Sequence, residues 1–362
     1  MNKPDIEIQR AAELQHIVYG TELRLIFKGT DVDRVLVNTL RQVVYSEIPV
    51  YGISRSSSII EKNSSIDDDN IMRQRLSMIP IRNVDCKVDF LEPVNYPYVN
   101  DMTGKIYPEK EHLRDAKDDV NINLFANITN DGKVTNGYDE TNIMYVTTND
   151  ITITVDGKET KDMYDHKYPL LIIKLKVGQS FSFNSKAQVG IAKLHSCWDA
   201  ISQCTYLQMD TNMYGFIIKS LGQRTEWNCL TVGCNIIINK ITRLKKDVTK
   251  KYKQDESKEI TLMIIKIEKE EHMMGNLLSS TLIKHPDIVS ASYKIDHPFI
   301  QEVTLLLDVK KGKSPINVFN YVCDFIVDTY TLVKKKLDKA EKEKFKPNEI
   351  LIAIKEKKPR KV

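Results

Sequence analysis

The chain contains two similar segments about 240 residues apart, and this internal repeat limits its possible folds more than any other feature. Each segment has an apolar run, then an amphipathic helical pattern, then a proline followed by a second apolar run. The first copy covers residues 23–53 and the second covers residues 260–293. Two diverged copies of a strand–helix–proline–strand unit in one chain favour a pairing of the units about a pseudo-two-fold axis.

The helical part of each copy is defined by apolar residues at three- and four-residue spacing. In the first copy this pattern predicts a helix at 32–47, with Asp31 as its N-cap and Pro49 preventing its continuation. In the second copy it predicts a helix at 271–285 that ends before Pro286. The apolar runs on either side predict strands that pack against these helices.

A longer amphipathic helix is expected further along the chain from each copy, at 226–247 and at 315–339. Thr225 is the expected cap of the former, and Ser314 followed by Pro315 is a typical start for the latter. Four helices with wide apolar faces suit a helix-on-helix interface, although each could instead pack only on its own sheet. The positions expected in an internal interface are Leu36, Leu40, Val44, Ile237, Ile241, Leu277, Leu278, Leu282, Phe319, Val322 and Ile326.

The residues between the two parts of the first dimerisation unit show a different pattern, which is typical of β-strands and turns. Short apolar alternations with turn signals such as Asp131-Gly132 and Asp156-Gly157 predict a mainly β insert, and the serine- and aspartate-rich residues 54–69 predict a loop. The expected fold is therefore α+β, with two paired sheet-and-helix units and a β-rich insert in the first. The expected divisions are 1–55 with 168–250 (first dimerisation unit), 56–167 (insert), 251–259 (linker), 260–340 (second dimerisation unit) and 341–362 (basic tail).

Composition places the chain among ordinary globular proteins. Its 362 residues are 28% charged, with a formal net charge of +4, which neither requires nor excludes nucleic acid as a partner. No stretch reaches the roughly 18 apolar residues of a membrane span, and the N-terminus lacks the apolar core of a signal peptide. We therefore expect a cytoplasmic protein whose six cysteines are reduced.

The side chains that catalysis or metal binding would need do not cluster in the sequence. Asp67-Asp68-Asp69 is the only dense acidic group, and its polar surroundings favour a solvated loop over a Mg²⁺ site. Phosphate-binding glycine loops and closely spaced cysteine or histidine pairs are absent. His272 and His297 fit a helix start and an exposed strand end better than catalytic roles. We therefore expect no catalytic residue, cofactor site or metal site in this chain.

Several segments resemble the α-type assembly subunits of multisubunit RNA polymerases, which include the third subunit of eukaryotic polymerase II and the bacterial α N-terminal domain. Residues 33–49 are similar to the family's signature helix, residues 73–81 to its basic RLGLIPL-type segment and residues 192–195 to its HAKW-type loop. Residues 271–278 and 293–298 resemble the smaller eleventh-type partner subunit. A fusion of both types resembles the arrangement in asfarviruses, of the African swine fever virus type.

The resemblance implies a non-catalytic assembly platform for viral transcription, located in the host cytoplasm, virus factories and virion. The platform would dock the second-largest subunit through Arg41, Arg73, Arg75 and Lys193. Its further partners would be the largest subunit and a small tenth-type zinc-bearing subunit, so Mg²⁺ and Zn²⁺ are expected only in other subunits. DNA would be contacted only through the complex, and no homo-oligomer is expected.

Two departures from the family pattern bear on these expectations. Gln42 follows Arg41 where the family often has a second arginine, so the contact surface there is expected to be rearranged. Cys86 is the only cysteine in residues 85–165, so the metal cluster that some relatives hold in the insert is expected to be missing.

A nucleic-acid-binding protein is the alternative from another functional class. It would use the lysine-rich linker at 250–258 and the basic tail at 355–361, although a tail of that composition can also serve only solubility. This alternative predicts tight, strongly salt-dependent DNA binding by the isolated chain.

Overall fold

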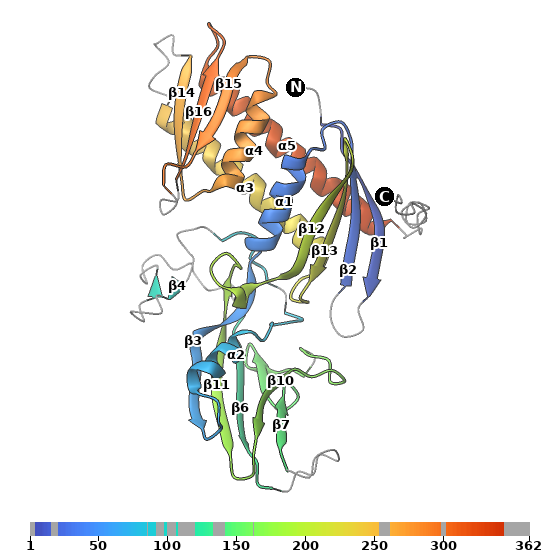
Figure 1. Ribbon diagram of the computed structural model, residues 1–362, viewed down its shortest axis with the longest axis vertical. Helices are drawn as coiled ribbons and strands as arrows, with labels where there is room; N and C mark the ends of the chain where they lie inside the picture. Colours follow the sequence, from blue (N-terminus) through green and yellow to red (C-terminus); the bar gives the residue numbers. More distant parts are fainter. Residues whose placement is uncertain are drawn as a thin grey trace, which may run out of the picture.

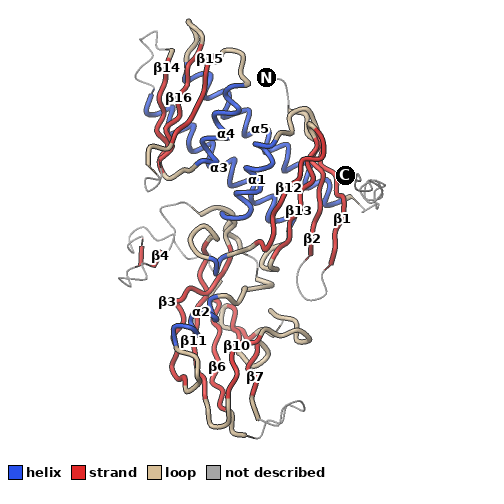
Figure 2. Tube along the Cα trace, in the orientation of Figure 1, coloured by secondary structure: helices blue, strands red, loops and turns tan. Residues whose placement is uncertain are grey.

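The computed structural model describes residues 4–15, 21–84, 86–91, 98–99, 106–107, 120–132, 142–161, 163–252, 261–297 and 302–343. These residues form two sheet-and-helix units side by side, with a β-rich insert extending from the first unit (Figures 1 and 2). One apolar cluster runs through both units, and a second cluster fills the insert. The predicted α+β class, with two paired units and a mainly β insert, is confirmed.

The first unit is a four-stranded antiparallel sheet, in the order β1-β2-β13-β12, combined with two helices. Leu25, Phe27 and Phe216 point from its strands into the shared core. The elements are β1 (Glu7–Gln15), β2 (Thr21–Lys28), α1 (Arg34–Ser46), β12 (Ile201–Asp210), β13 (Met213–Ser220) and α3 (Glu226–Tyr252). Helix α3 runs past the predicted end at 247, and the lysines of its last turn suit the negative end of the helix dipole.

The N-cap of α1 is Asp33, and the prediction that Asp31 would cap this helix was wrong. The Asp33 side chain accepts a hydrogen bond from the Leu36 amide at 2.8 Å. The Asp31 carboxylate instead accepts from the Asp5 amide at 2.8 Å and thereby holds the start of β1 next to the helix. The two aspartates flank Val32, the first residue of the apolar pattern, so the spacing alone could not show which of them caps the helix.

The insert has a five-stranded sheet, in the order β3-β11-β6-β8-β9, and a two-stranded sheet of β7 and β10. Its elements are β3 (Val50–Asn63), α2 (Asp69–Ser77), β6 (Ile122–Thr129), β7 (Met144–Thr147), β8 (Thr152–Val155), β9 (Lys158–Glu159), β10 (Leu171–Leu175) and β11 (Ser180–Gly190). A separate pair is formed by β4 (Tyr98–Val99) and β5 (Ile106–Tyr107). A 3₁₀ turn, η4 (Ser196–Trp198), leads back to the first unit.

Strand β3 replaces most of the loop predicted at 54–69, so that prediction was wrong. The strand continues to Asn63 because β11 pairs with it along its length, and the Ser185 hydroxyl donates to the buried Ser58 hydroxyl at 2.9 Å. Cross-strand hydroxyl pairs satisfy serines that the sequence pattern assigns to loops. Strands β10 and β11 also pair with insert strands, whereas the sequence-based division assigned residues 168 onward to the first dimerisation unit.

The second unit repeats the plan with three strands in the order β14-β16-β15. Its elements are β14 (Leu262–Glu268), α4 (His272–Ile283), β15 (Ile288–Lys294), β16 (Glu302–Val309) and α5 (Pro315–Lys342). Exposure alternates strictly along β14, as expected for a strand with one face on a core. Helix α5 opens with Ser314 and Pro315 as predicted, although the Ser314 side chain makes no capping hydrogen bond.

The two long helices reach across to the opposite unit. Helix α5 contacts α3 and also β1 of the first sheet, while the Tyr252 hydroxyl near the end of α3 donates to the Ile264 carbonyl oxygen on β14 at 2.7 Å. Figure 1 shows α3 and α5 crossing behind α1 and α4. Each unit therefore completes its core with a helix from the other, which makes the pairing part of the fold of both.

Gly233 permits the close crossing of α1 and α3. A Cβ atom at this position would lie 2.6 Å from Cγ2 of Val44, closer than atoms can approach. We expect Gly233→Leu to lower the free energy of unfolding by about 1–3 kcal/mol, measured by urea unfolding, because extra methylenes force a packed interface apart. Lys246→Leu, at an exposed position of the same helix, is the control and should change stability little. Equal stability of the two variants would contradict this account of the crossing.

Candidate subunit interface

A groove with a volume of about 710 Å³ lies where the end of α1 meets the start of α4. We call it the central groove. Both units contribute to it, as does residue 193 from the segment that follows the insert. The lining residues are Arg41, Gln42, Tyr45, Ser46, Glu47, Lys193, Glu270, Glu271, His272, Met273 and Ile295. Charged groups therefore gather at the junction of the two units, next to an otherwise apolar interface.

A buried ion cluster joins three separate segments beneath the central groove. The Lys240 ammonium on α3 lies 2.8 Å from the Glu47 carboxylate and 3.1 Å from the Glu270 carboxylate, and all three side chains are at most 15% exposed. Burial opposes the charge on Lys240, but the two carboxylates outweigh it and raise the pKa of the ammonium. Burial raises the pKa of the Glu270 carboxyl, against the attraction of Lys240. The cluster ties the end of α1 to the start of α4.

Two of the predicted partner-contact residues, Arg41 and Lys193, line the central groove together. The Arg41 side chain is half-buried, and its Nε donates to the Asn38 side chain at 3.1 Å. The Lys193 ammonium lies 3.0 Å from the Glu271 carboxylate, so it ties the first unit to the second. The structure thus brings together two cations that are far apart in the sequence.

Arg73 and Arg75, the other two predicted contact residues, lie on α2 of the insert and do not line the central groove. The Arg75 guanidinium lies 3.0 Å from the exposed Asp67 carboxylate. Arg73 donates to the Asn70 side chain at 3.2 Å. Their role in partner contact stays a prediction, and it requires a partner that reaches both the groove and the insert.

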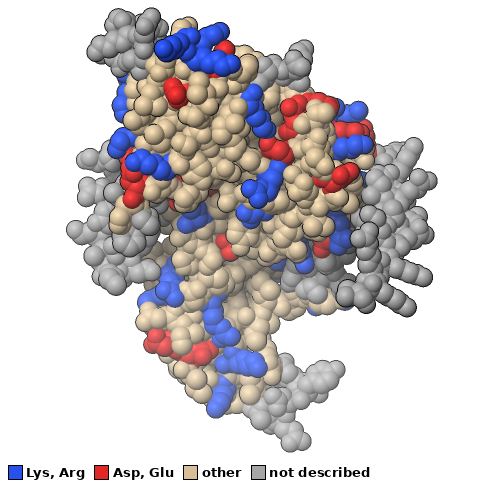
Figure 3. All heavy atoms as spheres, turned by 45° about the horizontal axis from the view of Figure 1, so that its top comes forward, with Lys and Arg blue, Asp and Glu red and all other residues tan. Residues whose placement is uncertain are grey.

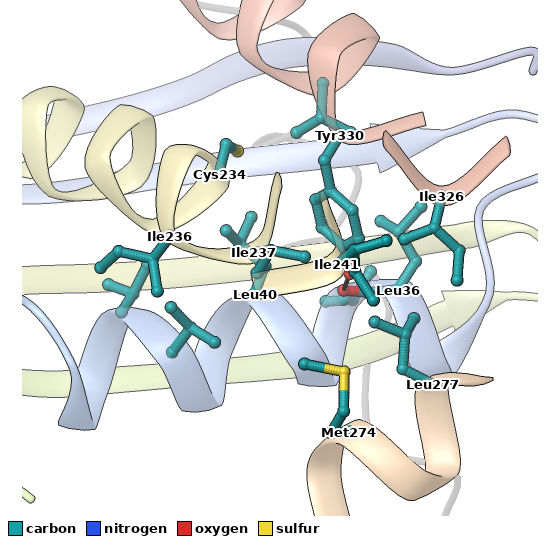
Figure 4. Packing of buried hydrophobic residues seen from close by; sticks show 14 of the residues in the cluster. Leu36, Leu40, Cys234, Ile236, Ile237, Ile241, Met274, Leu277, Ile326 and Tyr330 are labelled. Carbon is teal, nitrogen blue, oxygen red and sulfur yellow. Dashed lines mark hydrogen bonds between the residues drawn. The ribbon is translucent and has the colours of Figure 1, made fainter. Parts of the chain in front are cut away.

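The residues predicted for the internal interface are all buried, and all lie in the cluster that runs through both units. Figure 4 shows Leu36 and Leu40 of α1 facing Ile237 and Ile241 of α3, with Leu277, Ile326 and Tyr330 closing the group from α4 and α5. Helix α1 contacts α3 and α4, and α5 contacts both α3 and α4. The helices therefore pack on one another as well as on their own sheets.

Sequence reasoning missed the polar ties inside this apolar interface. The Tyr330 hydroxyl donates to the Leu36 carbonyl oxygen at 3.1 Å across the two units, and Lys334 donates to Asn235 at 2.9 Å. Lys240 was missed as well, although it interrupts the apolar stripe of α3 between Ile237 and Ile241. A charged residue in the middle of an apolar stripe is the signal that could have indicated a buried ion pair.

The cysteines show no sign of a reactive or metal-binding role. All six are buried and unpaired, and burial raises the thiol pKa to about 12 for five of them, among them Cys229 and Cys234. Within the residues that the structure describes, no group of three or more histidine, cysteine or acidic side chains is placed to hold a metal ion. In the same part of the chain, no helix is both long and apolar enough to cross a membrane.

The surface charge of the two units is mixed. On the face shown in Figure 3, lysine and arginine side chains alternate with aspartate and glutamate over both units and the insert. The linker and the tail to which the nucleic-acid alternative assigned binding lie almost entirely outside the described residues. The described residues on the face in Figure 3 therefore form no continuous basic stripe of the kind that a nucleic-acid-binding protein would use.

Two α+β units that share one core and exchange their long helices define an intramolecular pseudo-dimer. Residues 262–336, which run from β14 through most of α5, match the family model described as the RNA polymerase Rpb3/Rpb11 dimerisation domain. The chain is 26% identical over 351 residues to a putative DNA-directed RNA polymerase subunit, R470, of Acanthamoeba polyphaga mimivirus. This alignment covers 92% of this chain and 95% of that relative.

Shorter relatives match parts of the chain. A DNA-directed RNA polymerase subunit Rpo3 from Pyrobaculum arsenaticum is 30% identical over 186 residues, 51% of this chain and 58% of the relative. A probable DNA-directed RNA polymerase II subunit RPB11 from Caenorhabditis briggsae is 28% identical over 96 residues, 26% of this chain and 79% of the relative. Residues 262–336 therefore carry an Rpb3/Rpb11-type dimerisation domain, and the chain as a whole is similar to RNA polymerase subunits. The asfarvirus part of the predicted resemblance stays a prediction.

Proposed function

We propose that the chain is a non-catalytic assembly platform of a viral DNA-directed RNA polymerase that docks the second-largest catalytic subunit through the central groove. The largest subunit and a small tenth-type zinc-bearing subunit complete the proposed set of partners, which supply Mg²⁺ and Zn²⁺. The chain acts as a single pseudo-dimer, without a homo-oligomer, and contacts DNA only through the complex. The proposed location is the host cytoplasm, with virus factories and the virion.

The observation that carries this proposal is the position of the central groove. It lies at the junction of the two units, where Arg41 and Lys193 of the first unit meet Glu270 and Glu271 of the second, so the complete groove exists only when the units are paired. A partner that binds there therefore recognises the paired state. Fusion of the units in one chain keeps them at high effective concentration, so this surface forms without a search for a separate chain.

Arg41→Glu tests this docking site. We expect the variant to fold normally, because Arg41 is half-buried and its Nε makes only a local hydrogen bond to Asn38. The affinity for the second-largest subunit should fall about tenfold or more. The new carboxylate would repel the acidic partner group that the Arg41 guanidinium is proposed to contact. Binding is measured with purified proteins by surface plasmon resonance at moderate salt.

Lys219→Glu, on the inner strand β13 and outside the central groove, is the matched charge-reversal control and should bind like the original protein. If Arg41→Glu folds and binds with unchanged affinity, the groove is not the docking site. The nucleic-acid alternative is tested in the same preparation: tight DNA binding that weakens by orders of magnitude between 50 and 200 mM salt would favour it.

A further inference from the structure

The sheet of the second unit lacks a strand that the sheet of the first unit has. The strand orders are β1-β2-β13-β12 in the first sheet and β14-β16-β15 in the second. In both sheets the strand before the short helix, β2 or β14, pairs antiparallel with the strand before the long helix, β13 or β16. Among the described residues, the place that β1 takes beside β2 is therefore empty beside β14, at the margin of the sheet in Figure 1.

The free edge of β14 presents backbone hydrogen-bonding groups. The Val309 amide donates to the Thr261 carbonyl oxygen at 2.9 Å, and β14 and β16 stay in one register from Leu262 onward. Because hydrogen bonding alternates along an antiparallel ladder, odd-numbered residues of β14 bond to β16 and even-numbered residues point away from it. The amides and carbonyl groups of Lys266 and Glu268 therefore face the free edge.

A groove with a volume of about 320 Å³ lies between this edge and the C-terminal half of α3. We call it the edge groove. The Tyr252 hydroxyl donates to the Ile264 carbonyl oxygen at 2.7 Å and so occupies one end of the edge. Residues 266 and 268 lie beyond this contact. The edge groove shares only Glu270 with the central groove, so a partner that fills one groove leaves the other free.

The lining of the edge groove favours a strand with apolar residues on one side and acidic residues on the other. Phe90 and Leu244 are half-buried and form an apolar wall on the side of α3. The exposed cations outnumber the exposed carboxylates, with Arg243, Lys251, Lys266 and Lys269 against Asp247 and Glu268. Since successive side chains of a strand point to opposite faces, one strand can meet both surfaces.

Lys266 already has one acidic neighbour, Glu302, at 2.8 Å. This pair lies on the outer face of the sheet, where the lysine is 56% exposed, and such pairs are weak. An acidic side chain opposite Lys266 on an added strand would be its direct cross-strand neighbour, and opposite charges in that position stabilise strand pairing.

Strand β1 shows the same alternation in the first unit. Ile8 and Ala12 are buried, whereas Glu7 and Glu13 are exposed. Helix α5 contacts β1, just as α3 would contact a strand placed beside β14. The first unit thus contains, within its own chain, the kind of strand that the second unit leaves room for.

We propose that the edge groove receives an extended segment of a partner polypeptide as a fourth strand beside β14. The segment pairs with the backbone of Lys266 and Glu268, directs apolar side chains toward Phe90 and Leu244, and directs acidic side chains toward Lys266. In this mode of recognition the backbone hydrogen bonds give affinity and the alternate side chains give specificity. The site goes beyond the docking proposed at the central groove and does not depend on it.

A synthetic peptide tests the proposal on the full chain. The probe is the acetylated, fluorescein-labelled hexapeptide amide Glu-Val-Glu-Val-Glu-Val, with binding followed by fluorescence anisotropy. Amide hydrogen exchange followed by NMR should show that the peptide slows exchange at Lys266 and Glu268, whose amides face the free edge. Equally tight binding of the peptide with lysine in place of glutamate, or binding without this protection, would contradict the proposal.

Lys266→Pro removes an amide of the free edge, while Lys266→Ala keeps it. Proline is tolerated on an edge strand where the amide does not take part in the ladder, and both variants lose the contact with Glu302. We expect the alanine variant to bind the peptide within about threefold of the original protein and the proline variant about tenfold or more weakly, because it lacks one pairing group. Equal affinities of the two variants would overturn strand addition.

A backbone-methylated peptide gives the same test without altering the protein. Methylation of alternate peptide nitrogens removes the donors that would pair with β14, so one of the two methylation patterns should abolish binding and the other should not. If neither pattern reduces binding, the peptide does not add to the sheet. This measurement decides the question even where the proline variant fails to fold.

Charge reversal tests the acidic character of the segment. Lys251→Glu, in the edge groove, should weaken peptide binding, whereas Lys246→Glu, exposed on the same helix but outside this groove, should not. Equal effects would show that only the general charge of α3 matters. Arg41→Glu, in the central groove, should bind the peptide normally, and a loss there would place the peptide in the wrong groove.

A second copy of the chain is the other possible occupant of the edge. Sedimentation of the free chain should show a monomer. A dimer that Lys266→Pro converts to a monomer would assign the edge to pairing between two copies and would overturn the proposal.

Discussion

Leu278→Asp should abolish the stable pairing of the two units. Leu278 is fully buried on α4, a helix that contacts α1, α5 and two strands of its own sheet. A carboxylate buried there would be neither hydrated nor paired with a cation. We therefore expect the loss in the free energy of unfolding to exceed the roughly 4–5 kcal/mol of the most damaging substitutions. A loss of this size is comparable to the whole stability of many domains. Thermal melting followed by circular dichroism measures it.

Ile283→Asp is the matched control for this prediction. It lies on the same helix and changes an apolar residue in the same way, but its side chain is 60% exposed. We expect it to shift stability by less than about 0.5 kcal/mol, as is usual for surface positions. Similar melting curves for the two variants would show that α4 does not carry the interface.

Lys240→Met should have the second-largest effect, a loss of about 3–5 kcal/mol in the free energy of unfolding. The substitution keeps the length of the side chain but leaves Glu47 and Glu270 facing each other in a buried site without their cation. Two close carboxylates cannot both stay ionised there, so the loss reflects an uncompensated charge. Urea unfolding at pH 7 measures the change.

The triple variant Glu47→Gln, Lys240→Met and Glu270→Gln separates charge from packing. Because it removes all three charges, it should recover most of the stability that Lys240→Met loses, as replacement of whole buried ion clusters often does. A triple variant as unstable as Lys240→Met would indicate that the lysine stem, and not the charge balance, holds the three segments together.

The pKa of Lys240 also predicts the direction of a pH effect. Its carboxylate partners raise this pKa above its ordinary value of 10.5, so the folded protein holds the proton more tightly than the unfolded chain. The stabilisation is fully present below the unfolded pKa and is lost as pH rises through the higher folded value. The original protein should therefore lose stability above about pH 10 more steeply than the triple variant does.

Apolar spacing in the sequence was enough to predict the four interface helices and the positions buried along them. Leu36, Leu40, Ile237, Leu278 and Ile326 could be identified because a helix face that lacks polar residues must be covered. The proline that follows the helix in each copy and the cap at Thr225 likewise act within a few residues, and the Asn228 amide does donate to the Thr225 hydroxyl at 3.2 Å. Arg41 and Lys193 were reached only through the resemblance to a known family.

The sequence alone thus determined the repeat, the helices and which of their faces are buried, because those signals are local and periodic. Only the tertiary structure decided that α3 and α5 complete each other's units, that serine-rich residues extend β3, and that Lys240 meets Glu47, 193 residues away. The physical reason is that the energy of a buried charge, or of an unpaired acceptor such as Gln42 Oε1, depends on the atoms that surround it. Those atoms come from segments that are far apart in the sequence, so a local sequence pattern cannot predict them.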